Sequence, residues 1–65
     1  MDRENKIARA VESCLGEVEF SEAPFRRVDH FLWLLQSDPA WREEEIVAVR
    51  TEVVRELMKR AGLVE

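Results

Sequence analysis

The sequence predicts an all-α fold of three helices, two short and one long and C-terminal, and three observations support this prediction. Apolar residues recur with helical spacing along most of the chain. No long stretch alternates polar and apolar residues as a half-buried strand would. Only two glycines and two prolines occur, and they fall between the helical segments or near their ends. The 65 residues are expected to form a single domain, residues 1–65.

The first helix is expected over residues 2–15, with Asp2 as its N-cap and Gly16 just beyond its end. Its apolar residues recur at the spacing of one helical face; they are Ile7, Ala8, Val11, Cys14 and Leu15. The acidic connection over residues 17–22 is expected to be a loop whose Val18 and Phe20 pack on the core. A short strand that pairs with a second copy is the alternative for this segment.

The second helix is expected to begin near Ser21 or Ala23 and to end at residues 36–37. Pro24 suits its first turn, where a missing N–H has no cost. The helix is apolar nearly all round, which is typical of a buried helix, yet only two other segments could cover it. One face carries Phe25, Val28, Phe31, Leu32 and Leu35.

The third helix is expected over residues 39–61, capped by Asp38 and stopped by Gly62. At 1.5 Å per residue it would be roughly 34 Å long, whereas a domain of this size has a radius of gyration of about 11 Å. Unless it breaks near Trp41, it should overhang its neighbours and leave apolar residues uncovered. These residues are Val53, Val54, Leu57, Met58 and Leu63.

Composition argues against several functional classes. The net charge of −4 disfavours nucleic acid binding, which depends on Lys and Arg neutralising phosphates. One cysteine and one histidine provide neither a disulfide nor a zinc site. No apolar run is long enough to span a membrane, and the N-terminal residues do not resemble a signal peptide. We therefore expect a cytoplasmic, non-enzymatic protein with no cofactor, metal or small-molecule substrate.

The residues that could carry chemistry have simpler explanations. His30 has no nucleophile or carboxylate at helical spacing to converge on it, so a surface or interface position is expected. Cys14 lies on the apolar stripe of the first helix and is expected to be a buried thiol. Residues 43–45, three consecutive glutamates, fan out around a helix and are expected to serve its N-terminal dipole rather than bind a metal.

The surplus apolar surface predicts association with another chain. We expect a protein interaction or regulatory module that forms a homodimer or docks on a larger protein, using Trp33, Leu34, His30, Arg50, Val54, Leu57 and Met58. Arg50 lies among apolar residues, so it either reaches the edge of the stripe or pairs with an acid from its own chain or a second one. A helix-turn-helix is the alternative function, although residues 43–45 would repel phosphates at the start of its recognition helix.

Overall fold

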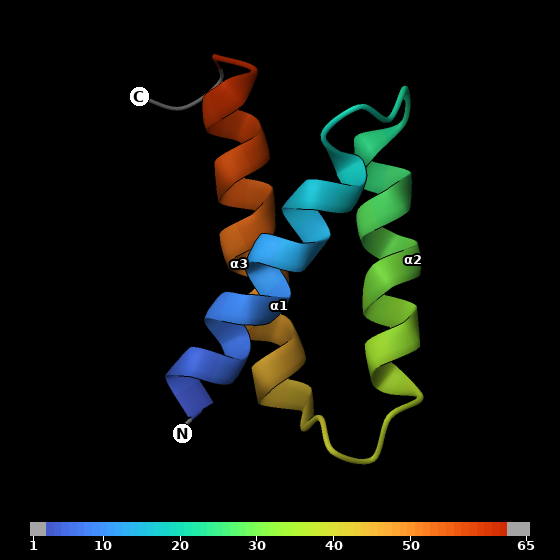
Figure 1. Cartoon of the computed structure of the whole chain (residues 1–65), viewed down its shortest axis with the longest axis vertical. Helices are drawn as coiled ribbons and strands as arrows, with labels where there is room; N and C mark the ends of the chain where they lie inside the picture. The colour runs from blue at the N-terminus through green and yellow to red at the C-terminus, as the bar shows by residue number, and fades with distance from the viewer. Residues whose placement is uncertain (1–2, 63–65) are drawn as a thin grey trace.

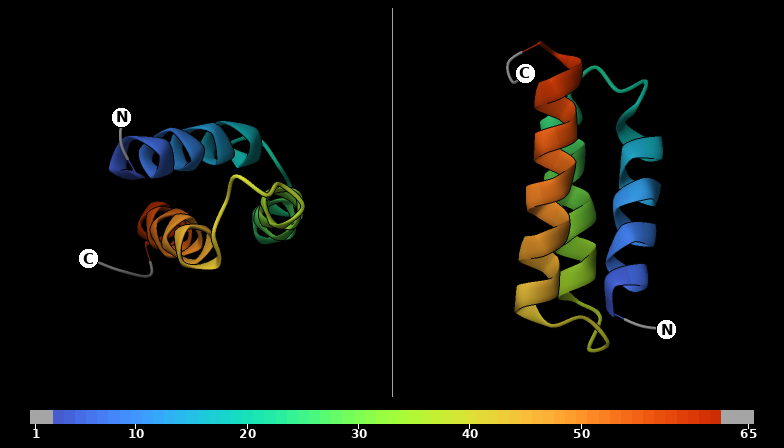
Figure 2. Two further views of the ribbon diagram at one scale, coloured as in Figure 1. Left: turned by 90° about the horizontal axis from the view of Figure 1, so that it is seen from below. Right: turned by 90° about the vertical axis from the view of Figure 1, so that its left-hand side faces the viewer.

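Three helices make up the computed structural model, which describes residues 3–62: α1 (Arg3–Val18), α2 (Pro24–Gln36) and α3 (Glu43–Arg60). α2 and α3 run antiparallel, and α1 crosses one face of this pair (Figure 1). Seen end-on, α1 is one layer and the α2–α3 pair is the other, so the opposite face of the pair carries no helix (Figure 2). The extents of 33 × 22 × 16 Å and the radius of gyration of 11.6 Å fit the size expected from chain length. The all-helical, three-helix prediction is confirmed.

The first helix extends further than predicted. α1 continues through Gly16 to Val18, so the expected end at Leu15 is wrong. Val18 is only 2% exposed and belongs to the core, and burying it offsets the roughly 1 kcal/mol that a glycine costs inside a helix. The prediction that Phe20 packs on the core is also wrong, because this side chain is 90% exposed. Asp2, the predicted N-cap, lies outside the described residues.

The third helix begins at Glu43, four residues later than predicted. Asp38 caps a turn instead of the helix: its Oδ1 accepts a hydrogen bond from the Ala40 N–H at 2.9 Å, and its carbonyl accepts one from the Trp41 N–H at 3.0 Å. Arg42, with extended backbone angles, is the N-cap. Glu45 Oε1 accepts a hydrogen bond from the Arg42 N–H at 2.9 Å, which is half of a capping box.

The overhang predicted for the third helix is therefore absent among the described residues. α3 has 18 residues, about 27 Å, and α1 with 16 residues is nearly as long rather than short. Val53 is fully buried, and Leu57 packs against the core. Val54 and Met58 are half-buried, and Leu63 lies outside the described residues.

The side chains that are fully buried in the core are small. They are Val28, Val49, Val53 and Cys14. None of the five aromatic residues of the chain reaches full burial: Trp41 and Phe31 are half-buried, and the other three are exposed. The exposed residues Phe20, Phe25 and Trp33 therefore leave large apolar surfaces available for contact.

Candidate interaction surface

A groove of about 590 Å³ runs between α2 and α3, and no residue of α1 lines it. We call it the α2–α3 groove. Its apolar lining comes from both helices and from the loop between them, while polar side chains stand around it. The lining residues are Asp29, Leu32, Trp33, Gln36, Trp41, Glu43, Ile46, Val47 and Arg50.

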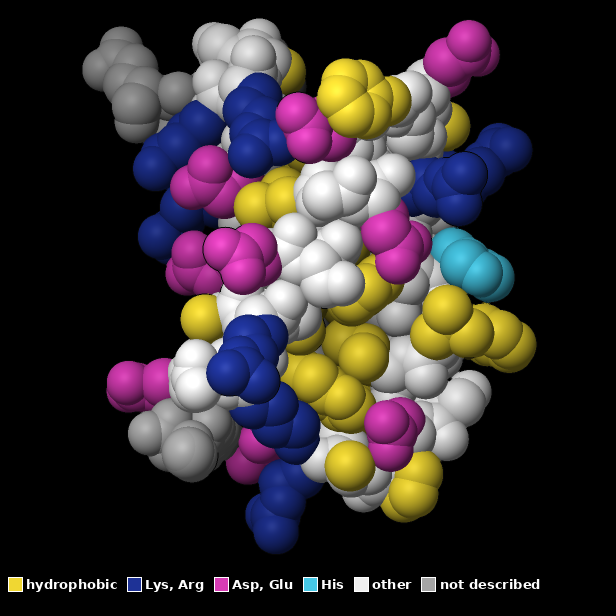
Figure 3. Space-filling model, viewed as in Figure 1, with side chains coloured by type: hydrophobic (Ala, Val, Ile, Leu, Met, Phe, Trp, Pro, Cys, Tyr) yellow, Lys and Arg dark blue, Asp and Glu magenta, His cyan; other side chains and the backbone are white. Residues whose placement is uncertain are grey.

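Trp33 and Val47 are the most exposed apolar side chains of this groove, at 59% and 54%. They project from different helices and border one hollow. His30 stacks on Trp33 from the preceding turn, with ring centroids 6.1 Å apart and an interplanar angle of 23°. Figure 3 shows the one histidine at the outer edge of α2, next to exposed hydrophobic side chains. The stack holds the indole of Trp33 in a defined orientation.

Arg50 and Asp29 line the α2–α3 groove from opposite helices. Both are exposed, and the side chain of neither residue forms an ion pair or hydrogen bond with another residue of the described part. An ion pair of Arg50 with an acid of its own chain, one of the alternatives from the sequence, is therefore absent among residues 3–62. The exposure of Arg50 agrees with a position at the edge of the apolar stripe. Two unpaired charges of opposite sign thus border the same apolar groove.

A second, shallower hollow continues along the outer side of α3. Arg50 belongs to both hollows, and Val54 and Met58 line the second one together with Thr51 and Arg55. Val47, Val54 and Met58 are spaced by seven and four residues, which places them on one side of the helix. The exposed stripe of α3 is therefore continuous with the α2–α3 groove.

The other predicted site residues lie apart from this surface. Leu34 is 50% exposed but does not line the groove. Leu57 is half-buried and packs against the core. Sequence reasoning missed Val47 and the contribution of Trp41 to the groove wall, although Val47 precedes Arg50 by three residues and Val54 by seven, a helical spacing that could have revealed it.

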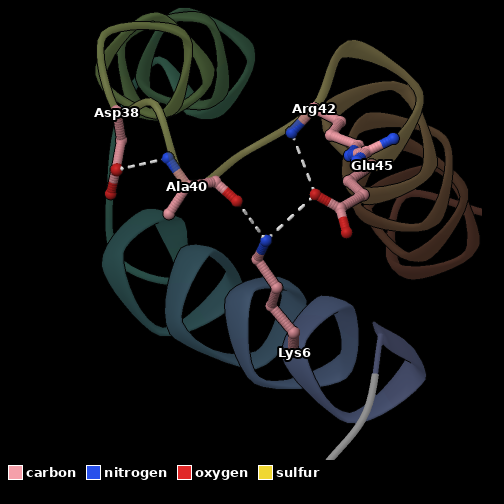
Figure 4. A network of polar contacts seen from close by, with 5 residues as sticks. All are labelled: Lys6, Asp38, Ala40, Arg42 and Glu45. Atoms are coloured by element: carbon pink, nitrogen blue, oxygen red, sulfur yellow. Dashed lines mark hydrogen bonds and ion pairs between the residues drawn. The ribbon is translucent and has the colours of Figure 1, made fainter.

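A polar network connects α1 to the loop over residues 37–42 and to the start of α3 (Figure 4). Lys6 of α1 donates hydrogen bonds from Nζ to the Ala40 carbonyl and, at 2.9 Å, to Glu45 Oε1. The same Nζ lies 4.4 Å from the centroid of the Trp41 ring, within the range of a cation–π contact. Glu45 is only 7% exposed, and the ion pair with Lys6 offsets the cost of burying its charge. This network ties the loop over residues 37–42 to α1 and so holds Trp41 in place.

Neither a metal-ligand cluster nor a reactive thiol is found among the described residues. No group of three or more His, Cys, Asp or Glu side chains among residues 3–62 could hold a metal ion. Burial, and secondarily the charge of Glu17, raises the pKa of the Cys14 thiol from 9.0 to about 11, which makes it a poor nucleophile. Within the same range, no helix combines the length and apolar character needed to cross a membrane.

Comparison with protein family models, with curated proteins and with solved structures finds no match for this chain. Function is therefore argued from the surface itself.

Proposed function

We propose that this protein is an interaction module that forms a homodimer through the α2–α3 groove and the adjoining stripe of α3. The main support is that Trp33 and Val47 are more than half exposed on opposite sides of one apolar groove. Tryptophan is enriched among the residues that dominate binding energy at protein interfaces.

The charges of the groove favour a second copy as the partner. In a two-fold dimer the same surface is used twice, so a contact from residue i to residue j is repeated from j to i. With a two-fold axis parallel to the groove, α2 of one copy would face α3 of the other. Arg50 of each copy would then face the other copy's Asp29, and both unpaired charges would gain a partner.

The test is a charge-reversal series followed by sedimentation equilibrium at micromolar concentration. The unaltered chain is expected to sediment as a dimer. Arg50→Glu and Asp29→Arg each place like charges together across the interface, and each is expected to weaken dimerisation at least tenfold, about 1.4 kcal/mol. The double variant Asp29→Arg/Arg50→Glu exchanges the charges and is expected to restore the dimer.

Arg27→Glu is the matched control, because Arg27 is exposed on α2 and does not line the α2–α3 groove. It is expected to leave the dimer unchanged. Equal weakening by Arg27→Glu and Arg50→Glu would contradict the proposed interface, as would a chain that stays monomeric throughout.

A larger protein partner that covers the same groove is the other form of this proposal. A monomeric chain that binds such a partner, and loses this binding when Trp33 is replaced, would indicate it.

No observation favours the helix-turn-helix alternative: α2 and α3 run antiparallel (Figure 1) and are joined by residues 37–42, a longer connection than the usual three or four residues. The single, buried cysteine is consistent with a reducing compartment, and we keep the cytoplasm as the proposed location.

A further inference from the structure

A second apolar groove, of about 480 Å³, lies between α1 and α3 and shares no lining residue with the α2–α3 groove. We call it the α1–α3 groove. Its floor is apolar, and every charged residue that lines it is a glutamate. The floor residues are Ile7, Ala8, Val11 and Leu15, and the bordering residues are Glu4, Glu12, Glu52 and Glu56. In Figure 3, acidic side chains lie beside hydrophobic ones where α1 crosses α3, and Lys and Arg side chains lie next to them.

The glutamates stand on both walls of this groove. Glu4 and Glu12 are on α1 and are exposed, and their carboxylates form no ion pair or hydrogen bond with other described residues. Glu52 and Glu56 are on α3, and each lies 3.8 Å from a cation one turn later, Arg55 and Lys59 respectively. Exposed pairs at this distance contribute little, so both carboxylates are free to exchange partners.

We propose that the α1–α3 groove binds a cationic amphipathic helix of another protein. An apolar floor between two acidic walls is complementary to a helix with an apolar stripe and Lys or Arg on both flanks. This proposal concerns a surface separate from the α2–α3 groove and does not depend on the dimer.

The dimensions agree with such an occupant. Glu4, Ala8 and Glu12 follow one another every four residues along α1 and span about 12 Å. A bound helix with apolar anchors at positions i, i+3 or i+4, and i+7 covers about 10.5 Å by the same rise. The small side chain of Ala8, midway between Glu4 and Glu12 in the sequence, leaves room for a large apolar anchor.

The helix α2 of a second copy is a poorer occupant. The exposed cations of α2, the helix that carries Trp33, are Arg26 and Arg27, and they lie together at its N-terminal end. They cannot flank an apolar stripe over the full length of the groove. Docking of α2 in this groove would also be head-to-tail, and such a contact builds rings or open chains rather than a closed dimer.

The experiment measures the fluorescence anisotropy of a labelled synthetic peptide mixed with the full chain. The peptide has leucines at i, i+3, i+4 and i+7 positions with lysines on both flanks. A matched peptide carries glutamates in place of the lysines. The lysine peptide is expected to bind, to bind more weakly as ionic strength rises, and to bind at least tenfold more tightly than the glutamate peptide.

Two pairs of variants locate the binding site. Ala8→Arg fills the groove and is expected to weaken peptide binding at least tenfold, whereas Ser13→Arg adds the same charge at an exposed position of α1 outside the groove and is expected to have little effect. The triple variant Glu12→Gln/Glu52→Gln/Glu56→Gln is compared with Glu17→Gln/Glu19→Gln/Glu22→Gln, which changes the net charge equally outside the groove. Only the first triple is expected to reduce affinity.

Three results would overturn the proposal: no binding of the lysine peptide, equal binding of both peptides, or equal losses from the members of either variant pair. A change in the sedimenting mass of the protein on Ala8→Arg would identify a second copy as the occupant and would also overturn it. Because Ala8 lies outside the α2–α3 groove, failure of the peptide-binding proposal would not contradict the proposed dimer. Conversely, a monomeric chain that binds the lysine peptide would contradict the dimer and support the peptide-binding proposal.

Discussion

Replacing Trp33 with alanine is the prediction that bears most directly on the α2–α3 groove. With about 250 Å² for a whole tryptophan, an exposed fraction of 59% leaves roughly 150 Å² to be covered, or about 3.7 kcal/mol at 25 cal/mol per Å². Truncation of a dominant interface residue typically costs about 2–4 kcal/mol, and a two-fold dimer contains Trp33 twice. We therefore predict that Trp33→Ala raises the dimer dissociation constant by about a thousandfold or more.

Phe20→Ala is the control for this variant. Phe20 is 90% exposed and does not line the α2–α3 groove, so its loss removes an exposed aromatic ring without touching the interface. Sedimentation equilibrium across the micromolar range is the assay. The Phe20 variant is expected to remain dimeric, whereas the Trp33 variant is expected to be monomeric. A Trp33 variant that dimerises as tightly as the Phe20 variant would refute the reasoning.

A companion variant separates dissociation from unfolding. The buried part of Trp33 is about 100 Å², so Trp33→Ala also costs the monomer roughly 2.5 kcal/mol, which circular dichroism will detect. Val47→Lys avoids this problem, because Val47 is 54% exposed and lysine is a better helix former than valine. It is expected to leave the helical content unchanged and to dissociate the dimer, since it places an unpaired charge in the interface. A folded, fully dimeric Val47→Lys variant would contradict the proposed interface.

Three further predictions concern the fold and are measured by thermal unfolding. Gly16→Ala is expected to stabilise the protein by about 0.5–1 kcal/mol, because Gly16 is helical and a Cβ there meets no atom within 4 Å; a lower melting temperature would contradict the helical placement. Lys6→Met removes one of the partners of the buried Glu45 carboxylate and is expected to cost about 2 kcal/mol, or roughly 10 °C, while Lys59→Met at an exposed pair should change the melting temperature little. The pKa of the Cys14 thiol is raised from 9.0 to about 11, so its contribution to the free energy of unfolding is complete below pH 9 and is lost as the pH rises towards 11. Cys14→Ala is expected to remove this part of the pH dependence. An unchanged dependence of the melting temperature on pH between 9 and 11 would contradict this prediction.

Helical periodicity predicted which segments form helices, but local signals misplaced their ends. Gly16 and the Asp38–Pro39 pair are sequence features that usually mark a helix boundary. In the fold, burial of Val18 carries α1 past the glycine, and the Asp38 side chain closes a turn that delays α3. The ends of α1 and α3 thus depend on contacts that form only in the folded chain, and a local sequence pattern does not reveal such contacts.

The sequence predicts that apolar side chains are exposed, but it does not predict correctly which ones. The angle of Trp33 away from the buried face of its helix follows from the sequence, and this residue is exposed. The sequence predicts a longer third helix and so places Val53 in an overhang, whereas Val53 is fully buried. The acidic border of the α1–α3 groove could not be foreseen, because it depends on how α1 crosses α3.

The central claim is that this chain covers its exposed apolar surface with a second copy of itself, and the mass of the unaltered protein in solution tests it most directly. Light scattering at micromolar concentration is expected to give about 15 kDa, twice the chain mass of 7.6 kDa. A single species of 7.6 kDa at every concentration would contradict the claim.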